Sequence, residues 1–487
     1  MKALSPQERA APPTNVSAPG PLYASRVKVY PKRVAGTWRR VKWVILTVCL
    51  TVYYGGAWLR WDRGPGAPDQ ALLIDMSAGR AYFFNIEIWP QEVYYITGLL
   101  VLAAVGLFFV TSLFGRVWCG YVCPQTVWTD LFMLVERWIQ GDRSARIRLD
   151  KAPWNARKIA LKTATHAAWL LIAAATGGAW VLYFDDAPTV ARQFFAGEST
   201  TGVYFFVGLF TTTTYLLAGW AREQVCTYMC PWPRFQAAML DEHSAAVTYR
   251  AWRGEVRGPI RKNVEPAPGT GDCIDCKACV YVCPTGIDIR DGLQMSCIGC
   301  GLCIDACNEI MGKVDRAPNL IAWTSIAYEA ERAQGRPARY RFVRPRTILY
   351  AALLTLVAAV MVVALALRTT VEVNVLRDRM PQFVLLADGA VRNGYTVKIL
   401  NKARQPRSFR IQATGLADLV MSPAEGEASD GVVTVLAKPD SIETVALFVK
   451  VRRTVLDGAN KTVTFRVLDT EGRVVARRDT VFVGPAR

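Results

Sequence analysis

Two adjacent runs of cysteines carry the clearest chemistry in this sequence. Each run has the spacing C-x2-C-x2-C-x3-C, the first ending at Cys283 and the second at Cys307. Bacterial two-cluster ferredoxins have this spacing, and in them the fourth cysteine of one run binds the cluster of the other. The sequence therefore predicts two [4Fe–4S] clusters that move single electrons. The predicted ligands of the first cluster are Cys273, Cys276, Cys279 and Cys307. The predicted ligands of the second cluster are Cys297, Cys300, Cys303 and Cys283.

Zinc sites and disulfides are the alternatives for these eight cysteines. Structural zinc sites also use four cysteines each, but they seldom repeat a four-cysteine run with crossed spacing. Disulfides are not expected if the segment lies in the cytoplasm. Pro284 follows the fourth cysteine of the first run, and Asn308 stands at that place in the second run. Because proline is not a ligand, this departure leaves the cluster prediction unchanged.

A second set of cysteines occurs in two copies of the motif C-x-Y-x-C-P, each at the end of an apolar segment. The duplication suggests two helix pairs related by an internal pseudo-symmetry. Cysteines at positions i and i+4 are expected on one helical face, and the two pairs could converge on one copper or redox site, since soft sulfur suits Cu(I), zinc and iron–sulfur centres. The alternative is that buried free cysteines are common and Cys-Pro simply ends a helix. The four candidates are Cys119, Cys123, Cys226 and Cys230.

Three other residues are less promising as ligands. Cys49 stands alone within an apolar segment and is expected to be a packing residue. His166 lies in a predicted span but His243 follows the fourth span near the cytoplasm, so the helix bundle lacks the two histidines of a bis-histidine haem. A packing role is expected for His166, with a role as proton or copper partner as the alternative.

The composition predicts a membrane protein. The 487 residues are 52% hydrophobic, and five stretches approach the ~20 apolar residues that a spanning helix needs. They are residues 41–59, 93–114, 157–184, 202–220 and 347–367. The lipid bilayer is therefore the first expected partner.

The distribution of charge predicts the orientation. Residues 1–40 contain 8 Lys and Arg, residues 116–158 contain 8 and residues 221–346 contain 17, whereas residues 60–92 contain 3 and residues 185–201 contain 1. The positive-inside rule then places the N-terminus and the clusters in the cytoplasm, and five spans place the C-terminus outside. Because the net charge of +18 is explained by the cytoplasmic face, no nucleic-acid partner is expected.

The C-terminal part changes to alternating strands separated by turns. Six or seven short strands predict an immunoglobulin-like β-sandwich. This part contains neither Cys nor His. We therefore expect it to dock another protein or to act as a spacer, rather than to bind a metal.

The expected fold is thus a multi-domain membrane protein: an α-helical transmembrane bundle of about five helices, a ferredoxin-like cytoplasmic domain and a C-terminal immunoglobulin-like β-sandwich. The expected divisions are a disordered basic tail over 1–40, a four-helix membrane domain over 41–250, the two-cluster domain over 251–346, the fifth helix over 347–367 and a periplasmic domain over 371–487. The expected location is the bacterial cytoplasmic membrane.

This order of domains resembles the cytochrome c oxidase accessory proteins of the FixG/RdxA/CcoG type. The resemblance covers nearly the whole chain; the eight cluster cysteines match the family's ferredoxin motif, and the C-x-Y-x-C-P cysteines match its membrane motif. It implies a membrane-bound iron–sulfur cupric reductase that reduces Cu(II) to Cu(I) for assembly of a C-family haem–copper oxidase. Copper would be the substrate, and a copper chaperone or exporter, or oxidase assembly factors, would be partners. The electron donor is not identified, and the sequence has no nucleotide-binding motif.

Two other functions stay open at this point. One is a quinol-linked electron-transfer subunit of the kind found with periplasmic nitrate reductases, whose membrane ferredoxins share the paired C-x3-C-P motifs. The other is a non-enzymatic scaffold for oxidase assembly, in which the clusters sense redox state or stabilise the fold.

Overall fold

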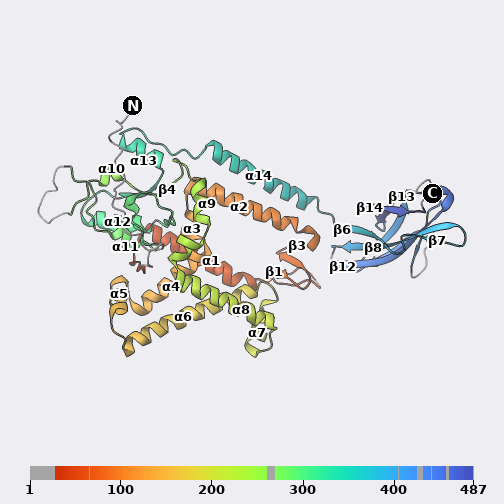
Figure 1. The fold of residues 1–487 in the computed structure, drawn as a ribbon, viewed down its shortest axis with the longest axis horizontal. Helices are drawn as coiled ribbons and strands as arrows, with labels where there is room; N and C mark the ends of the chain where they lie inside the picture. Colours follow the sequence, from red (N-terminus) through yellow and green to blue (C-terminus); the bar gives the residue numbers. More distant parts are fainter. Residues whose placement is uncertain are drawn as a thin grey trace, which may run out of the picture. The chain divides into compact units, whose positions relative to one another are not determined.

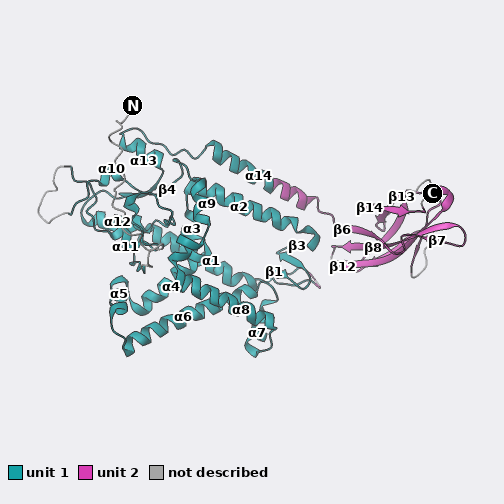
Figure 2. Ribbon diagram, viewed as in Figure 1, with its two compact units in different colours: residues 1–63, 67–358 teal, residues 64–66, 359–487 magenta. Residues whose placement is uncertain are grey.

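The computed structural model describes residues 28–64, 66–259, 269–403, 405–424, 431–439, 441–456 and 460–485. The chain divides into two compact units, residues 1–63 with 67–358 and residues 64–66 with 359–487 (Figure 2). The first unit contains the helices and the ferredoxin-like segment. The second contains the end of the last long helix and the β-sandwich.

Five helices in the described residues are long and apolar enough to cross a membrane (Figure 1). Large apolar side chains on these helices remain exposed, among them Leu100 (65%), Leu171 (72%) and Val362 (66%). An outward-facing apolar surface of this kind suits lipid rather than water. The helices are α1 (Thr37–Gly55), α2 (Tyr94–Phe114), α6 (Ala156–Val181), α14 (Pro345–Ala366) and α8 (Thr201–Thr214), which continues as a π-helix to Ala221 to complete its span.

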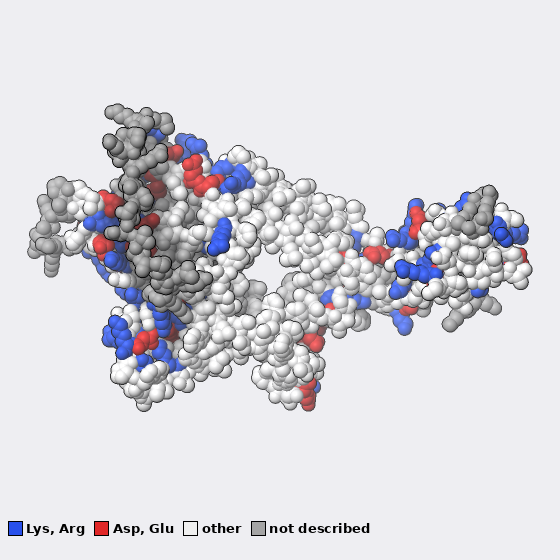
Figure 3. All heavy atoms as spheres, viewed as in Figure 1, with Lys and Arg blue, Asp and Glu red and all other residues white. Residues whose placement is uncertain are grey.

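Shorter elements connect these helices. A small antiparallel sheet follows α1, formed by β1 (Leu72–Asp75), β2 (Arg80–Phe83) and β3 (Ile86–Ile88). On the face shown in Figure 3, Lys and Arg gather toward the end of the first unit that carries the ferredoxin-like segment, and an uncharged surface covers the middle of the long helices. The connecting helices are α3 (Val117–Tyr121), α4 (Pro124–Gln140), α5 (Arg143–Lys151), α7 (Ala187–Ala196) and α9 (Trp232–Met239).

The ferredoxin-like segment begins earlier than residue 251. Strand β4 (Ala246–Tyr249) pairs antiparallel with β5 (Ile321–Thr324), so the domain includes β4. Between these strands lie two helices, α11 (Ala278–Val282) and α12 (Leu302–Lys313), which carry cysteines of both runs. The apolar core beneath them includes Val247, Ile289, Ile304, Met311 and Leu320.

The predicted disordered tail over 1–40 is wrong for residues 28–40; residues 1–27 lie outside the described residues. Helix α1 begins at Thr37, and the segment before it is held by specific contacts. The Arg146 guanidinium donates to the Pro31 carbonyl at 2.5 Å, and the Lys32 amide donates to the Tyr281 carbonyl at 2.7 Å. These contacts order the polar segment. Because the partners lie far away in the sequence, the composition of the segment itself does not reveal that order.

The second unit contains the predicted antiparallel sandwich. One sheet has the order β10 (Val420–Pro423), β12 (Ser441–Arg452), β8 (Ala390–Asn401) and β6 (Val371–Arg377), with β7 (Val384–Leu385) also pairing with β8. The other has the order β11 (Val433–Ala437), β9 (Arg407–Thr414), β13 (Asn460–Leu468) and β14 (Val474–Val483). Alternate residues of both sheets form one apolar core, as in other sandwiches. Val397, Ile411, Leu447 and Phe465 are fully buried there.

Candidate metal centres

The four cysteines predicted for the second cluster line one small pocket, together with Cys279. Gly299 and Gly301, with φ values of 67° and 71°, turn the loop around this pocket. Glycine adopts this left-handed conformation without the steric cost that other residues meet. We call this set the second cluster site: Cys283, Cys297, Cys300 and Cys303.

The remaining cysteines of the two runs form the first cluster site. Burial, with smaller contributions from the nearby Cys279, Cys276 and Cys273, raises the pKa of the Cys307 thiol to about 12. Cys307 also packs against the apolar cluster that contains Cys273 and Cys279, and the crossed ligand pattern stays a prediction. An arginine flanks this site: Arg290 Nη1 lies 3.8 Å from Cys273 Sγ.

This grouping of cysteines suits a cubane. Among the described residues, no three His, Cys, Asp or Glu side chains lie in an arrangement that could hold a single metal ion. A cubane places iron and sulfide between its cysteine ligands, so those sulfurs stand farther apart than around one ion. Bound there, two clusters would supply electrons one at a time.

The two C-x-Y-x-C-P motifs come together although about a hundred residues separate them. Burial, with smaller contributions from Cys123, Cys119 and Cys230, raises the pKa of Cys226 to about 12. Burial also raises the pKa of Cys119, to about 11. The four thiols therefore lie within electrostatic reach of one another, and we call them the CxxxCP site.

The expectation that each pair lies on one helical face is wrong. Cys119 belongs to α3, but Cys123 has extended backbone with φ −55° and ψ 127°. In the second motif, Cys226 lies in a π-helical turn, Val225–Met229, and Cys230 again has extended backbone with φ −81° and ψ 125°. The residue before a proline avoids the α-helical region. Pro124 and Pro231 therefore turn the second cysteine of each motif out of the helix.

The CxxxCP site packs directly against the loop of the second cluster. A Cβ on Gly120 would lie 2.8 Å from the Gly299 carbonyl oxygen, so no larger residue fits there without movement. The Tyr121 hydroxyl donates to the Cys300 carbonyl at 3.0 Å. Cys119 and Cys300 also belong to one buried apolar cluster, against which Cys226 packs. The sequence analysis did not predict this junction. Gly120, inside the first motif, was a signal that another segment of backbone approaches closely there.

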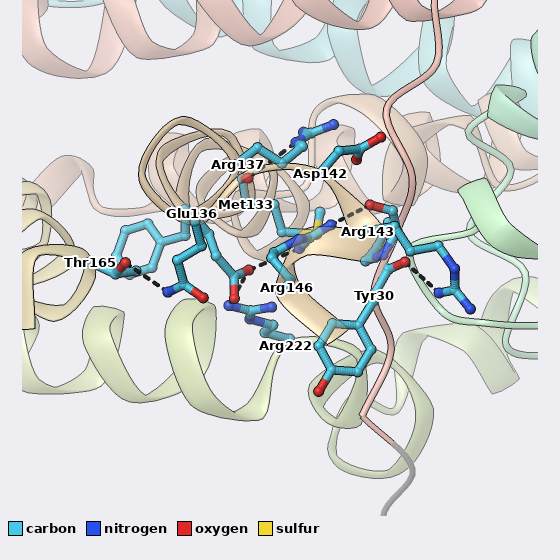
Figure 4. A network of polar contacts seen from close by, with 12 residues as sticks. Tyr30, Met133, Glu136, Arg137, Asp142, Arg143, Arg146, Thr165 and Arg222 are labelled. Carbon is cyan, nitrogen blue, oxygen red and sulfur yellow. Dashed lines mark hydrogen bonds and ion pairs between the residues drawn. The ribbon is translucent and has the colours of Figure 1, made fainter. Parts of the chain in front are cut away.

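Two buried ionic networks support the site, and sequence reasoning missed both. Asp130 on α4 pairs with Arg39 at 2.9 Å and with Lys42 at 3.6 Å. Glu136, nearly two turns later, pairs with Arg146 at 3.1 Å and Arg222 at 3.0 Å (Figure 4). Burial alone would raise the pKa of Glu136, but Arg222 and Arg146 outweigh it and hold the pKa below its usual value. The first network joins α4, which follows the first motif, to α1. The second joins α4 to α5 and to Arg222, just before the second motif.

The histidines have separate surroundings. His166 Nδ1 and the Tyr215 hydroxyl are 2.9 Å apart, and the His166 ring also contacts Trp169 and Trp220. His243 Nε2 lies 3.6 Å from a Glu242 carboxylate oxygen. These contacts are those of packing and hydrogen bonding.

Comparison with known proteins gives consistent matches along the chain. Family models described as "4Fe-4S binding domain", "4Fe-4S dicluster domain" and "IG-like fold at C-terminal of FixG" match residues 96–144, 221–326 and 361–485. The nitrogen fixation protein FixG of Rhizobium meliloti is 48% identical over 458 residues, which is 88% of this chain and 87% of that protein. Protein RdxB of Cereibacter sphaeroides is 47% identical over 477 residues, covering 97% of this chain and 99% of that protein. Protein RdxA of the same organism is 49% identical over 411 residues, covering 84% of this chain and 86% of that protein.

Proposed function

The chain belongs to the FixG family of membrane iron–sulfur electron-transfer proteins, and from this premise we propose that it reduces Cu(II) to Cu(I) at the CxxxCP site. The Cu(I) formed would serve assembly of a C-family haem–copper cytochrome c oxidase. The eight cysteines of the two cluster sites would hold the electron source.

One observation carries this proposal: the CxxxCP site and the second cluster site share a packed junction. Gly120 touches the loop of the second cluster, and Tyr121 donates a hydrogen bond to the carbonyl of Cys300, a cluster ligand. Cys119 and Cys300 lie in one buried apolar cluster. An electron leaving the second cluster site therefore meets the thiols of the CxxxCP site without crossing solvent.

The thiols suit the product of the reaction. One electron converts Cu(II) to Cu(I), and the soft Cu(I) ion prefers thiolate ligands. Two thiolates are enough to bind it, so a site for three or more ligands is not required. Because burial raises the pKa of Cys119 and Cys226, these thiols are protonated at neutral pH, and copper binding would release their protons.

The proposed topology places this chemistry on the cytoplasmic side. The Lys and Arg residues are concentrated in residues 116–158 and 221–346, which flank the two motifs and include the cluster sites. The positive-inside rule then puts the clusters in the cytoplasm and the C-terminal sandwich in the periplasm. A cytoplasmic copper chaperone or an exporter is the expected receiver of Cu(I), and a separate electron donor is required.

Anaerobic reoxidation tests the proposal. The full chain in detergent is reduced with dithionite, freed of excess reductant and mixed with Cu(II), and cluster absorbance and Cu(I) captured by a chelator are followed together. We expect one Cu(I) per electron lost. The variants C119A and C226A should slow the reaction, whereas C49A, which removes a cysteine outside all motifs, should not. Reduced clusters that stay reduced in excess Cu(II) would rule the proposal out.

A pocket in the helical bundle favours quinol-linked electron transfer as a second candidate. Its lining, between α4, α6 and the turn after α8, combines acidic, basic and aromatic side chains, including Glu136, His166 and Trp169. Such a lining could take a quinol ring and accept its protons. Reduction of the oxidised clusters by duroquinol, lost in H166A, would support this candidate. Clusters that stay oxidised in excess duroquinol would exclude it.

A further inference from the structure

We propose that Arg116 is a positioning residue that joins the CxxxCP site to the second cluster site and raises the reduction potential of that cluster. The inference rests on the clusters of the proposed function but does not depend on copper. It concerns which of the two clusters has the higher reduction potential.

Arg116 lies where the two sites meet. Its side chain is buried, and its guanidinium donates to the Met295 carbonyl, just before the second cluster loop. Its Nε donates to Gln236 Oε1 at 3.4 Å. The same oxygen accepts a hydrogen bond from Cys119 Sγ at 3.0 Å.

The backbone of Arg116 also supports the loop. A Cβ on Gly299 would lie 3.3 Å from the Arg116 carbonyl carbon and oxygen. The side chain and main chain of one residue thus contact both ends of the segment Met295–Gly299, which contains Cys297. This position lets Arg116 fix the loop relative to the Cys119 thiol on α3.

The charge of Arg116 is not compensated locally. Among the described residues, no carboxylate forms an ion pair with it. Arg290, the arginine at the first cluster site, differs: it pairs with Asp275 at 2.6 Å and with Asp288 at 2.6 Å. The two arginines therefore differ in net local charge. The charge of Arg290 is neutralised by two carboxylates, whereas Arg116 has no carboxylate partner among the described residues.

An uncompensated buried cation favours a neighbouring centre that becomes more negative. A [4Fe–4S] cluster gains one negative charge on reduction, and nearby charges tune its potential. Arg116 is within reach of this cluster site, because its guanidinium contacts the Met295 carbonyl, two residues before Cys297, and both Arg116 and Cys297 line one pocket. Burial of the second cluster site disfavours the added negative charge and lowers the potential of that cluster. The contribution of Arg116 is therefore isolated by comparing the potential of this same cluster with and without the arginine charge.

The consequence is a direction for electron flow. Arg116 draws the electron toward the second cluster, which is the one in contact with the CxxxCP site. The neutralised arginine at the first cluster site gives that cluster no equivalent pull. Electrons entering at the first cluster would pass to the second and then to the thiol-bound acceptor.

A redox titration followed by electron paramagnetic resonance tests this inference on the full chain in detergent, without copper. Arg116→Gln should shift the midpoint potential of the second cluster to lower values and leave the first unchanged, and Arg116→Lys should restore part of the shift. Arg234→Gln is the matched control, because Arg234 is exposed on the same helix as Gln236. The signals are assigned with Cys276→Ser and Cys300→Ser, which each remove one cluster.

A second variant covers the case in which Arg116→Gln loses the second cluster. Gln236→Glu keeps the arginine and places a carboxylate beside it, so it should also lower the potential of the second cluster. Equal shifts at both clusters, or no shift in a variant that retains both clusters, would overturn the inference. A copper-inactive protein that still shows the selective shift would contradict the proposed function alone.

Discussion

Gly120 packs against the backbone carbonyl of Gly299, although 179 positions separate the two residues. A Cβ on Gly120 would lie 2.8 Å from the Gly299 oxygen, closer than normal van der Waals contact. Because Gly120 lies between Cys119 and Tyr121, the contact brings the first C-x-Y-x-C-P motif onto the loop that carries Cys297 and Cys300. The CxxxCP site and the second cluster site can therefore approach this closely only because residue 120 is a glycine.

Gly120→Ala should separate these two sites. Forcing a methyl group into a packed contact costs about 1–3 kcal/mol, and the loop has to move away from α3 to accept it. We expect slower reoxidation of the clusters by Cu(II) at unchanged iron content, measured by stopped-flow absorbance. Gly178→Ala is the control, because a Cβ on Gly178, in α6, would meet no atom within 4 Å. Equal rates for G120A and wild type would show that the junction does not limit transfer.

The crossed ligand pattern makes a second prediction. Cys307→Ser should abolish the first cluster and Cys283→Ser the second, although each residue belongs to the other run. Each variant should fall from about eight irons per chain to about four, and the two should retain different paramagnetic signals. Cys276→Ser should match Cys307→Ser, and Cys300→Ser should match Cys283→Ser. The opposite pairing of spectra would refute the assignment, and Cys49→Ser should retain all the iron.

Local signals in the sequence were sufficient for some elements. The apolar stretch 93–114 became α2 (Tyr94–Phe114), and the alternating stretch 395–400 lies in β8 (Ala390–Asn401), because span length and strand alternation are properties of neighbouring residues. Cysteine spacing was similarly local, and the family model of a 4Fe-4S dicluster domain matches residues 221–326, which contain both cysteine runs.

The missed features depend on contacts between distant residues. The order of residues 28–36 comes from partners such as Arg146 and Tyr281, which a polar, proline-containing stretch does not reveal. The helical face expected for Cys119 and Cys123 failed for a local reason, since the effect of Pro124 on the preceding residue was not taken into account. The partners of Asp130 and Glu136 could not be identified, because any of many basic residues would have served equally well on sequence grounds.

Asp305 provides a third prediction, since it ties the ferredoxin-like segment to a membrane helix. Its carboxylate accepts hydrogen bonds from the backbone amides of Trp38 at 3.2 Å and Arg39 at 2.8 Å, at the start of α1. A carboxylate at this position satisfies amides that the helix leaves unpaired, and losing such a cap costs about 0.5–2 kcal/mol. Asp305→Ala should lower the thermal stability of the cluster domain and speed iron loss on heating. Glu309→Ala, on the same helix but paired with the exposed Lys313, should change stability much less, and equal losses in the two variants would argue against a capping role.

Glu136 provides a fourth prediction, in which the dependence on pH is informative. Its carboxylate is buried between Arg146 and Arg222, so Glu136→Gln leaves two buried cations without their partner and should cost about 3–5 kcal/mol. Because the pKa of Glu136 in the folded protein lies below its usual value, its stabilising contribution is complete above the unfolded value of about 4.3. That contribution is lost only as the pH falls through the lower, folded value. The difference in unfolding free energy between wild type and E136Q should therefore be the same at pH 7 and pH 5 and shrink below about pH 4.

Denaturation of both proteins in detergent across this pH range measures that difference. Glu198→Gln is a suitable control, because Glu198 is exposed and its removal should have little effect at any pH. A penalty for E136Q that does not shrink below about pH 4 would mean that the pKa of Glu136 in the folded protein is ordinary, and one that grows from pH 7 to pH 5 would mean that it is raised. In either case the two arginines would not outweigh burial, and the link that Glu136 forms between α4 and Arg222, four residues before Cys226, would be weaker than its geometry indicates.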